Sequence, residues 1–124
     1  MNGMLKDDIF TLVRQITECI NVIKGSYLDV SYDLSRGNIK KAMDNFDSLL
    51  KNMITVMEGM QYLAGCGYFS DSINKIETFN CILRDMVESL ENKDYVCLSD
   101  LLQDEFATCL DNMCYMLQNI SNMN

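Results

Sequence analysis

The sequence predicts an all-α protein, an antiparallel up-down four-helix bundle, and three observations carry this prediction. Apolar residues recur at alternating steps of four and three over the first two thirds of the chain, and this spacing places them on one stripe of an α-helix. The 124 residues include no proline, so no position forbids a long uninterrupted helix. Short segments of glycine and polar residues separate four helical patterns, and short connections make consecutive helices antiparallel.

The first helix is predicted over residues 5–34. Asp7 and Asp8 fall in its first turn, where negative charge suits the helix dipole. Gly25 and Ser26 either bend this helix or split it into two shorter ones. Its apolar seam is formed by Ile9, Val13, Ile16, Ile20, Ile23, Tyr27, Val30 and Leu34.

The second helix is predicted over residues 39–64. Gly37 suits the left-handed backbone conformation that closes the preceding helix, and Asn38 can cap the next one. The apolar surface of this helix is wider than one seam, so we expect neighbours to contact it on two sides. The seam is formed by Ile39, Met43, Phe46, Leu50, Met53, Met57, Met60 and Ala64, and it is flanked by Leu49, Ile54, Val56 and Leu63.

The third helix is predicted over residues 72–91, and one seam position is polar. Asn80 can be a core residue that fixes register or oligomeric state, as single polar core residues do in coiled coils. Alternatively, the seam runs through Phe79 and Leu83, and Asn80 lies at its margin. The apolar seam residues of this helix are Ile73, Ile76, Leu83, Val87 and Leu90.

The fourth helix is predicted over residues 95–120, with Asp94 as its N-terminal cap. Together the four helices form one domain over residues 1–124, which is long enough for a single core. A three-helix core with one arm exchanged in a dimer is the alternative. The inward side chains of the fourth helix are Leu98, Leu102, Phe106, Cys109, Met113, Met116 and Ile120.

The composition excludes several classes of function. The net charge is −8, and the ten basic residues form no patch that could follow a phosphate backbone, so we expect no nucleic-acid partner and no membrane partner. No run of about 18 apolar residues occurs, which predicts no transmembrane helix. Most of the six cysteines lie within helical patterns and no secretory signal precedes them, so we expect reduced, mostly buried thiols and a cytoplasmic location.

Histidine is absent, which removes the commonest general base and the commonest metal ligand. We therefore expect no catalytic residue, no cofactor and no metal site. One carboxylate-based alternative remains, a metal-dependent hydrolase that uses Asp85 and Glu88 together with Asp100 and Asp104. The members of each pair lie one helical turn apart, and antiparallel packing could bring the two pairs together.

The loop after the second helix is a candidate interaction site. Cys66 lies between two glycines and is flanked by the aromatic residues Tyr62, Tyr68 and Phe69. Such a loop can expose a reactive thiol or an aromatic docking patch. The interpretation we favour is that these aromatic side chains fold over the open end of the bundle.

The ten methionines suggest a second candidate interaction site. Met53, Met57 and Met60 lie in the seam of the second helix, and methionine is over-used on surfaces that accept several partners. The functional interpretation is an adaptable peptide groove between the second and fourth helices. The alternative, which we favour, is a soft core in a chain rich in Asn, Ile, Lys and Met.

Two short segments resemble small all-α bundle proteins of low-GC Gram-positive bacteria. The run Glu91-Asn-Lys-Asp-Tyr-Val-Cys-Leu-Ser-Asp-Leu-Leu-Gln-Asp-Glu105 resembles a segment of those proteins in which D-Y-V-x-L-x-D-L-L-x-x-E opens the last helix. The run Gly37-Asn-Ile-Lys-Lys-Ala42 is similar to their helix start, G-N-x-x-K-A. The resemblance covers about a fifth of the chain; it implies an all-α fold and a bacterial origin, and no catalytic residue.

The sequence therefore predicts a non-catalytic, cytoplasmic helical-bundle protein that acts in protein–protein interaction, as an adaptor or by self-association. The surplus apolar surface of the second and fourth helices motivates this expectation. A chaperone-like protein that binds an exported helical client is one alternative. The carboxylate-based hydrolase is the other.

Overall fold

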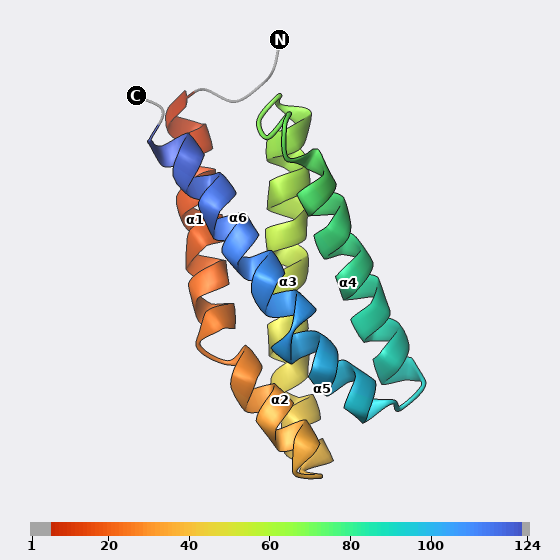
Figure 1. Ribbon diagram of the computed structural model, residues 1–124. Coiled ribbons are helices and arrows are strands. Elements are labelled where there is room, and N and C mark those ends of the chain that lie inside the picture. Colours follow the sequence, from red (N-terminus) through yellow and green to blue (C-terminus); the bar gives the residue numbers. More distant parts are fainter. Residues whose placement is uncertain (1–5, 123–124) are drawn as a thin grey trace.

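The computed structural model describes residues 6–122 and confirms an all-α, antiparallel four-helix bundle (Figure 1). Two of its four arms are bent, so the described residues form six helices. They are α1 (Lys6–Lys24), α2 (Tyr27–Ser35), α3 (Ile39–Gly65), α4 (Ile73–Glu91), α5 (Tyr95–Gln103) and α6 (Glu105–Ser121). Within the described range, no helix is both long and apolar enough to cross a bilayer.

The first arm, α1 and α2, is split at Gly25 and Ser26, as one of the two predicted alternatives has it. The Ser26 amide turns back to donate to the carbonyl of Ile23 at 3.0 Å. The eight-residue seam is confirmed, because seven of its side chains are buried and Tyr27 is half-buried. The first arm therefore keeps one apolar stripe across its bend.

The buried stripe of α3 is shifted from the predicted seam. Phe46, Met53 and Met60 are buried as expected, but the other seam residues except Met57 are only half-buried. The residues that complete the buried stripe are Ala42, Leu49, Val56 and Leu63. The predicted width is confirmed, since α3 packs against α1, α2 and α4 and so has neighbours on more than one side.

In α4, the structure decides between the two interpretations of Asn80. Asn80 is exposed, whereas Phe79 and Leu83 are buried. The interpretation of Asn80 as a polar core residue is therefore wrong, and the seam runs through Phe79 and Leu83.

The last arm, α5 and α6, is bent at Asp104, which the sequence did not predict. The seven predicted inward residues of this arm are all buried, and the Asp94 side chain caps α5 by accepting from the Cys97 amide at 3.1 Å. Asp104 has φ −104° and ψ −78°, and neither glycine nor proline marks the bend. All four arms pack within one chain, so the exchanged-arm alternative is not what the structure shows.

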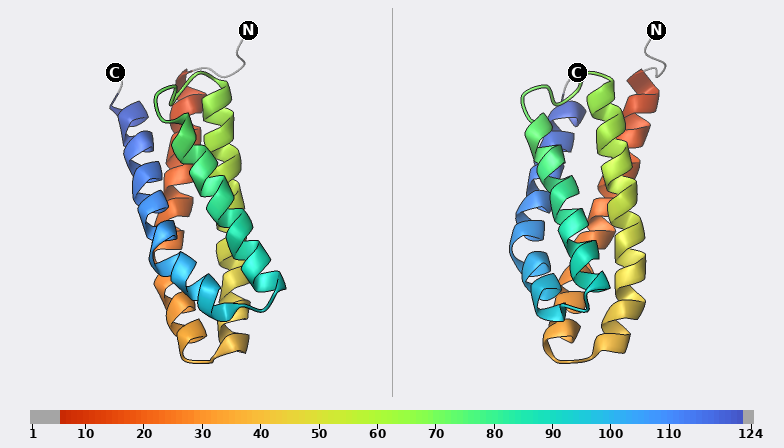
Figure 2. Two further views of the ribbon diagram at one scale, coloured as in Figure 1. Left: turned by 45° about the vertical axis from the view of Figure 1, so that its right-hand side comes forward. Right: turned by 90° about the vertical axis from the view of Figure 1, so that its right-hand side faces the viewer.

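The two bends lie at the same level of the bundle (Figure 2). Tyr27, just after the first bend, packs edge-to-face on Phe106, just after the second, with ring centroids 5.6 Å apart. Phe106 also lies 6.0 Å from the ring of Phe79 in α4. An aromatic cluster of three rings therefore fills the core where both arms change direction.

Below the bends, α2 and α5 meet through small polar residues. Ser31 and Ser99 are buried, their hydroxyl oxygens lie 2.9 Å apart, and each hydroxyl oxygen also lies 3.2 Å from the carbonyl oxygen of the other residue. Each hydroxyl has a single proton, so it donates either to the other hydroxyl or to the opposite carbonyl. Gln103 adds a bond from its amide nitrogen to the Ser31 hydroxyl at 2.8 Å. The small side chains allow the two helices to approach closely, and the bonds satisfy both buried hydroxyls.

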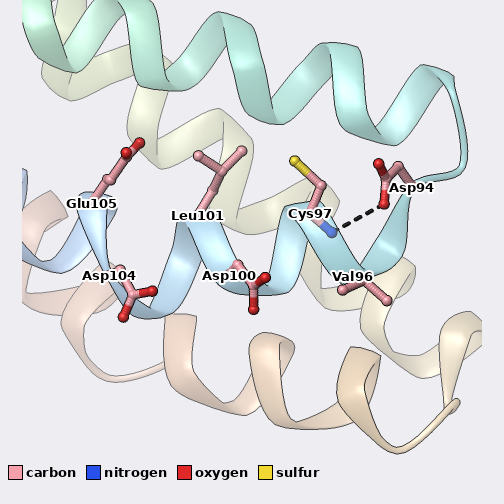
Figure 3. Close-up of a pocket in the computed structure, with 7 residues that line it drawn as sticks. All are labelled: Asp94, Val96, Cys97, Asp100, Leu101, Asp104 and Glu105. Atoms are coloured by element: carbon pink, nitrogen blue, oxygen red, sulfur yellow. Dashed lines mark hydrogen bonds between the residues drawn. The ribbon is translucent and has the colours of Figure 1, made fainter.

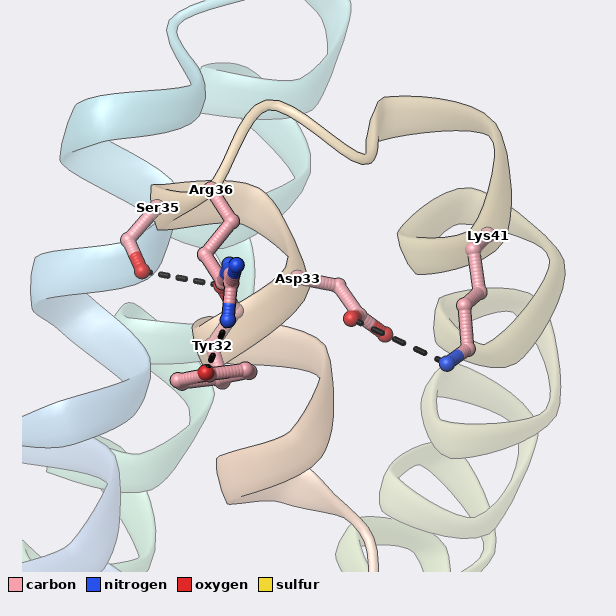
Figure 4. Close-up of polar contacts among 5 residues, drawn as sticks. All are labelled: Tyr32, Asp33, Ser35, Arg36 and Lys41. Carbon is pink, nitrogen blue, oxygen red and sulfur yellow. Dashed lines mark hydrogen bonds and ion pairs between the residues drawn. The ribbon is translucent and has the colours of Figure 1, made fainter.

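One ion pair joins the end of α2 to the start of α3, and further polar contacts lie within the end of α2 itself (Figure 4). Asp33 is buried, and its carboxylate lies 4.0 Å from the ammonium of Lys41. Arg36 donates to the Tyr32 hydroxyl and stacks over the Tyr32 ring, with 5.2 Å from the guanidinium to the ring centroid. Ser35 donates to the Tyr32 carbonyl at 2.9 Å.

Three helices end in the same way, with one residue in the left-handed region. Gly37, Gly67 and Lys93 have φ of 80°, 97° and 56°, and each follows the reciprocal hydrogen-bond pattern of a Schellman motif. After α4, for example, Asp94 donates to the Ser89 carbonyl at 2.8 Å and Lys93 donates to the Leu90 carbonyl at 3.0 Å. Glycine closes two of these turns, but lysine closes the third.

We predict that Lys93→Gly raises the free energy of unfolding by about 1 kcal/mol, because glycine has no Cβ to strain the left-handed conformation. Urea unfolding followed by circular dichroism measures this change. Lys93→Ala is the matched control, because it removes the same charge and keeps a Cβ, so its stability should stay close to wild type. Equal effects of the two variants would contradict the backbone explanation.

We predict that Gly59→Ala lowers the free energy of unfolding by about 1–2 kcal/mol, because overpacking of the core exceeds the gain in helix propensity. A Cβ at Gly59 would lie 2.5 Å from Cδ1 and 2.7 Å from Cγ1 of the buried Ile16. Gly65, in the same helix, has open space around it, so Gly65→Ala should be neutral or stabilising in the same urea titration.

A double-mutant cycle tests this contact directly. Ile16→Val should cost less in the Gly59→Ala background than in the wild type, because valine lacks the clashing Cδ1. Additive effects of the two substitutions would show that α1 and α3 do not touch at this point.

Candidate interaction surface

The predicted methionine site is mostly core. Met53 and Met60 are fully buried and Met57 is nearly so, and therefore the prediction of a peptide groove lined by all three is wrong. The proposed walls of that groove are also not neighbours, since α3 packs against α1, α2 and α4 and not against α5 or α6 in the described part of the chain. The soft-core interpretation accounts for these methionines.

The aromatic loop folds over the end of the bundle, as the favoured interpretation has it. Cys66, Tyr68 and Phe69 are half-buried and pack against the core, and the rings of Tyr68 and Phe69 lie 6.4 Å apart. Phe69 adopts φ 66°, an uncommon conformation for a bulky residue, which brings its ring onto the core. Of the predicted loop site, Tyr62 alone remains an exposed aromatic residue, with 44 % of its surface accessible.

An apolar groove lies between α3 and α4, with a volume of about 420 Å³. We call this feature the α3–α4 groove. Five of its eight lining residues are apolar; four of these are buried or half-buried, and the fifth, Ile54, is 46 % exposed. The residues that line it are Leu50, Ile54, Met57, Glu58, Asn80, Leu83, Arg84 and Val87.

The groove exists because α4 diverges from α3 toward its C-terminal end (Figure 1). The two helices pack against each other less extensively than α1 packs against α3 or α2 against α5. Side chains that would face a closely packed neighbour, such as Leu50 and Val87, are therefore left half-exposed. Both residues belong to the predicted seams, whereas Ile54 was expected only as a flank.

Two acidic grooves lie beside α5, and the four predicted hydrolase residues are divided between them. Asp85 and Glu88 line the groove between α4 and α5. Asp100 and Asp104 line the neighbouring groove, and Figure 3 shows both pointing away from α4. Antiparallel packing therefore does not bring the two pairs together, which contradicts the geometry that the hydrolase alternative requires.

The carboxylates around α5 do not assemble into a metal-binding cluster. Among residues 6–122, no group of three or more Asp, Glu, Cys or His side chains could hold a metal ion. Asp94, which lines both acidic grooves, is already engaged as the cap of α5. These acids are best described as a solvated surface.

A fourth groove, between α4 and α6, is lined by one exposed and one buried cysteine. Cys81 is exposed and Cys109 is buried, and both line this groove of about 680 Å³. Burial raises the pKa of the Cys109 thiol, and the nearby Glu105 raises it further. The Cys109 thiol is therefore neutral at physiological pH and behaves as a small apolar core group.

The sequence contained part of the signal for the α3–α4 groove. The excess width of the apolar surface on residues 39–64 indicated a second contact, and Leu50, Ile54 and Val87 were each recognised as apolar positions. The missing information was the divergence of α4, which depends on how α5 packs after the turn at residues 92–94. No local residue pattern reports that packing.

Comparison with known proteins supplies a family. The sequence profile described as "Domain of unknown function (DUF8042)" matches residues 11–114, which is most of the chain. No curated protein and no solved structure matches the chain. The functional argument therefore rests on the geometry of the surface.

We predict that iodoacetamide labels Cys81 rapidly in the native protein and labels Cys109 only after unfolding, because the reactive species is the exposed thiolate. Peptide mapping by mass spectrometry at neutral pH measures both rates. The same map in urea is the control and should show all six cysteines modified. Labelling of Cys109 as fast as Cys81 in the native protein would contradict the burial of Cys109.

The raised pKa of Cys109 makes the free energy of unfolding depend on pH, and the direction of that dependence follows from the shift. The folded thiol holds its proton more tightly than the unfolded thiol, so this contribution is complete below the unfolded pKa of about 8.5. It is lost progressively as the pH rises above that value. Cys109→Ala should remove this alkaline loss.

Proposed function

We propose that this chain, which belongs to the family described as domain of unknown function DUF8042, acts without catalysis by binding another protein at the α3–α4 groove. The observation that carries the proposal is the apolar character of this groove, with Ile54 almost half-exposed at its centre. Apolar grooves between two helices are a common way to receive an amphipathic helix of a partner.

Burial of the exposed apolar side chains of this groove against a partner contributes favourable binding free energy. Complete burial of an isoleucine side chain contributes about 1.5–3 kcal/mol relative to full exposure. Since 46 % of Ile54 is accessible, covering it contributes about 1 kcal/mol. The half-buried Leu50 and Val87 beside it add to this amount.

The chaperone alternative is a narrower form of the same proposal, with a client helix in the same groove. The hydrolase alternative has lost its supporting geometry, because its two carboxylate pairs line different grooves. A cytoplasmic location and a bacterial origin remain proposals. The first rests on the six cysteines and the second on the resemblance of residues 94–105 to small bundles of low-GC Gram-positive bacteria.

Site-specific photo-crosslinking in the source organism tests the proposed function. A benzoylphenylalanine that replaces Ile54 should form a discrete protein adduct on irradiation. The same residue in place of Val22, which is 57 % exposed on α1, is the matched control and should form none. An absence of adducts at position 54, or identical adducts at both positions, would contradict binding at the α3–α4 groove.

A further inference from the structure

We infer that α4 is the part of this bundle that opens first: it unfolds locally and uncovers the core while the helices it packs against stay folded. The inference goes beyond the proposed function, because it does not depend on a partner at the α3–α4 groove. The packing of α4, its polar links to other helices and the charges at its two ends carry the inference.

Grooves flank α4 on three sides. The α3–α4 groove, of about 420 Å³, lies between α4 and α3, a groove of about 680 Å³ lies between α4 and α6, and one of about 290 Å³ lies between the last turns of α4 and α5. Relative to its length, α4 packs against the rest of the bundle less extensively than any other described helix. Sparse packing is typical of segments that open locally.

Few polar links join α4 to its neighbours. Among residues 6–122, no ion pair connects α4 to another helix. One side-chain hydrogen bond does so, from the hydroxyl of Ser89 to the sulfur of Cys97 in α5 at 3.2 Å, and sulfur is a weak acceptor. The attachment of α4 therefore depends mainly on its apolar stripe.

The charges at both ends of α4 oppose its helix dipole. Its first turn contains Lys75 and no acid, and its last turn contains Glu88 and Glu91 and no base. Acids at the start and bases at the end are the stabilising arrangement, which α1 has. Among the six described helices, α4 alone has unfavourable charges at both ends, so its own sequence weakens the helix that packs most sparsely.

Opening of α4 uncovers apolar side chains of two other helices. The ring of Phe79 in α4 lies 6.0 Å from the ring of Phe106 in α6, and Met57 of α3 lines the α3–α4 groove. Phe106 and Met57 are buried in the closed bundle, and both lose cover when α4 leaves. The open form therefore exposes apolar surface that the closed bundle hides.

Native-state hydrogen exchange of the full chain, measured by mass spectrometry of peptides, tests the inference. We expect the protection factors of α4 amides to be at least tenfold smaller than those of the most protected amides in α1, α3 and α6. The reason is that α4 amides exchange by local opening, whereas the most protected amides exchange only by global unfolding. Equal maximal protection in all four helices would overturn the inference.

A substitution far from α4 sharpens this test. Ile20 is fully buried in α1, and α1 does not pack against α4. Ile20→Val should lower the protection factors of α1 amides about three- to tenfold, because the lost methyl group reduces global stability. The protection of α4 should stay unchanged, since the closed form and the form with α4 open both contain the altered contact. An equal fall in α1 and α4 would show that α4 exchanges by global unfolding and would overturn the inference.

An exchange of the end charges tests their role. The double variant Lys75→Glu with Glu91→Lys keeps the net charge and places an acid in the first turn of α4 and a base in the last, so the protection of α4 should rise about fivefold. The matched control, Arg14→Glu with Glu18→Arg, exchanges two exposed charges near the middle of α1 and should leave the protection of α4 unchanged. No rise in the first variant, or an equal rise in the control, would overturn the inference.

Discussion

The close contact between α2 and α5 at Ser31 and Ser99 is the constraint on which the rest of the bundle depends. Both side chains are small and buried, and each hydroxyl lies within hydrogen-bonding distance of the other hydroxyl and of the opposite backbone carbonyl. The two helices reach this contact only because both arms bend at the same level, where the rings of Tyr27 and Phe106 pack together. If either arm were straight, its lower half would pass the other arm without making the Ser31–Ser99 contact.

This contact also determines which surface the bundle leaves open. The turn between α4 and α5 spans only residues 92–94, so α5 cannot lie on α2 unless the end of α4 follows it away from α3 (Figure 2). The apolar residues of α3 that a closely packed α4 would cover are then left at the surface, Ile54 above all. The α3–α4 groove is therefore a consequence of core packing elsewhere in the chain.

Most of the helical architecture could be predicted from the sequence, because the period of apolar residues is a local signal. The seams of the first and last arms, the cap at Asp94 and the turn at Gly37 agree with the structure. The bend at Asp104, the Ser31–Ser99 contact and the divergence of α4 were missed. Each depends on residues far apart in the chain, and neither glycine nor proline marks the bend at Asp104.

The central claim is that the α3–α4 groove binds another protein. Photo-crosslinking with benzoylphenylalanine at position 54 tests it most directly, because only a molecule that contacts the groove is captured. The account predicts a discrete protein adduct from position 54 and none from position 22, which is exposed on α1. No adduct from position 54, or the same adducts from both positions, would contradict it.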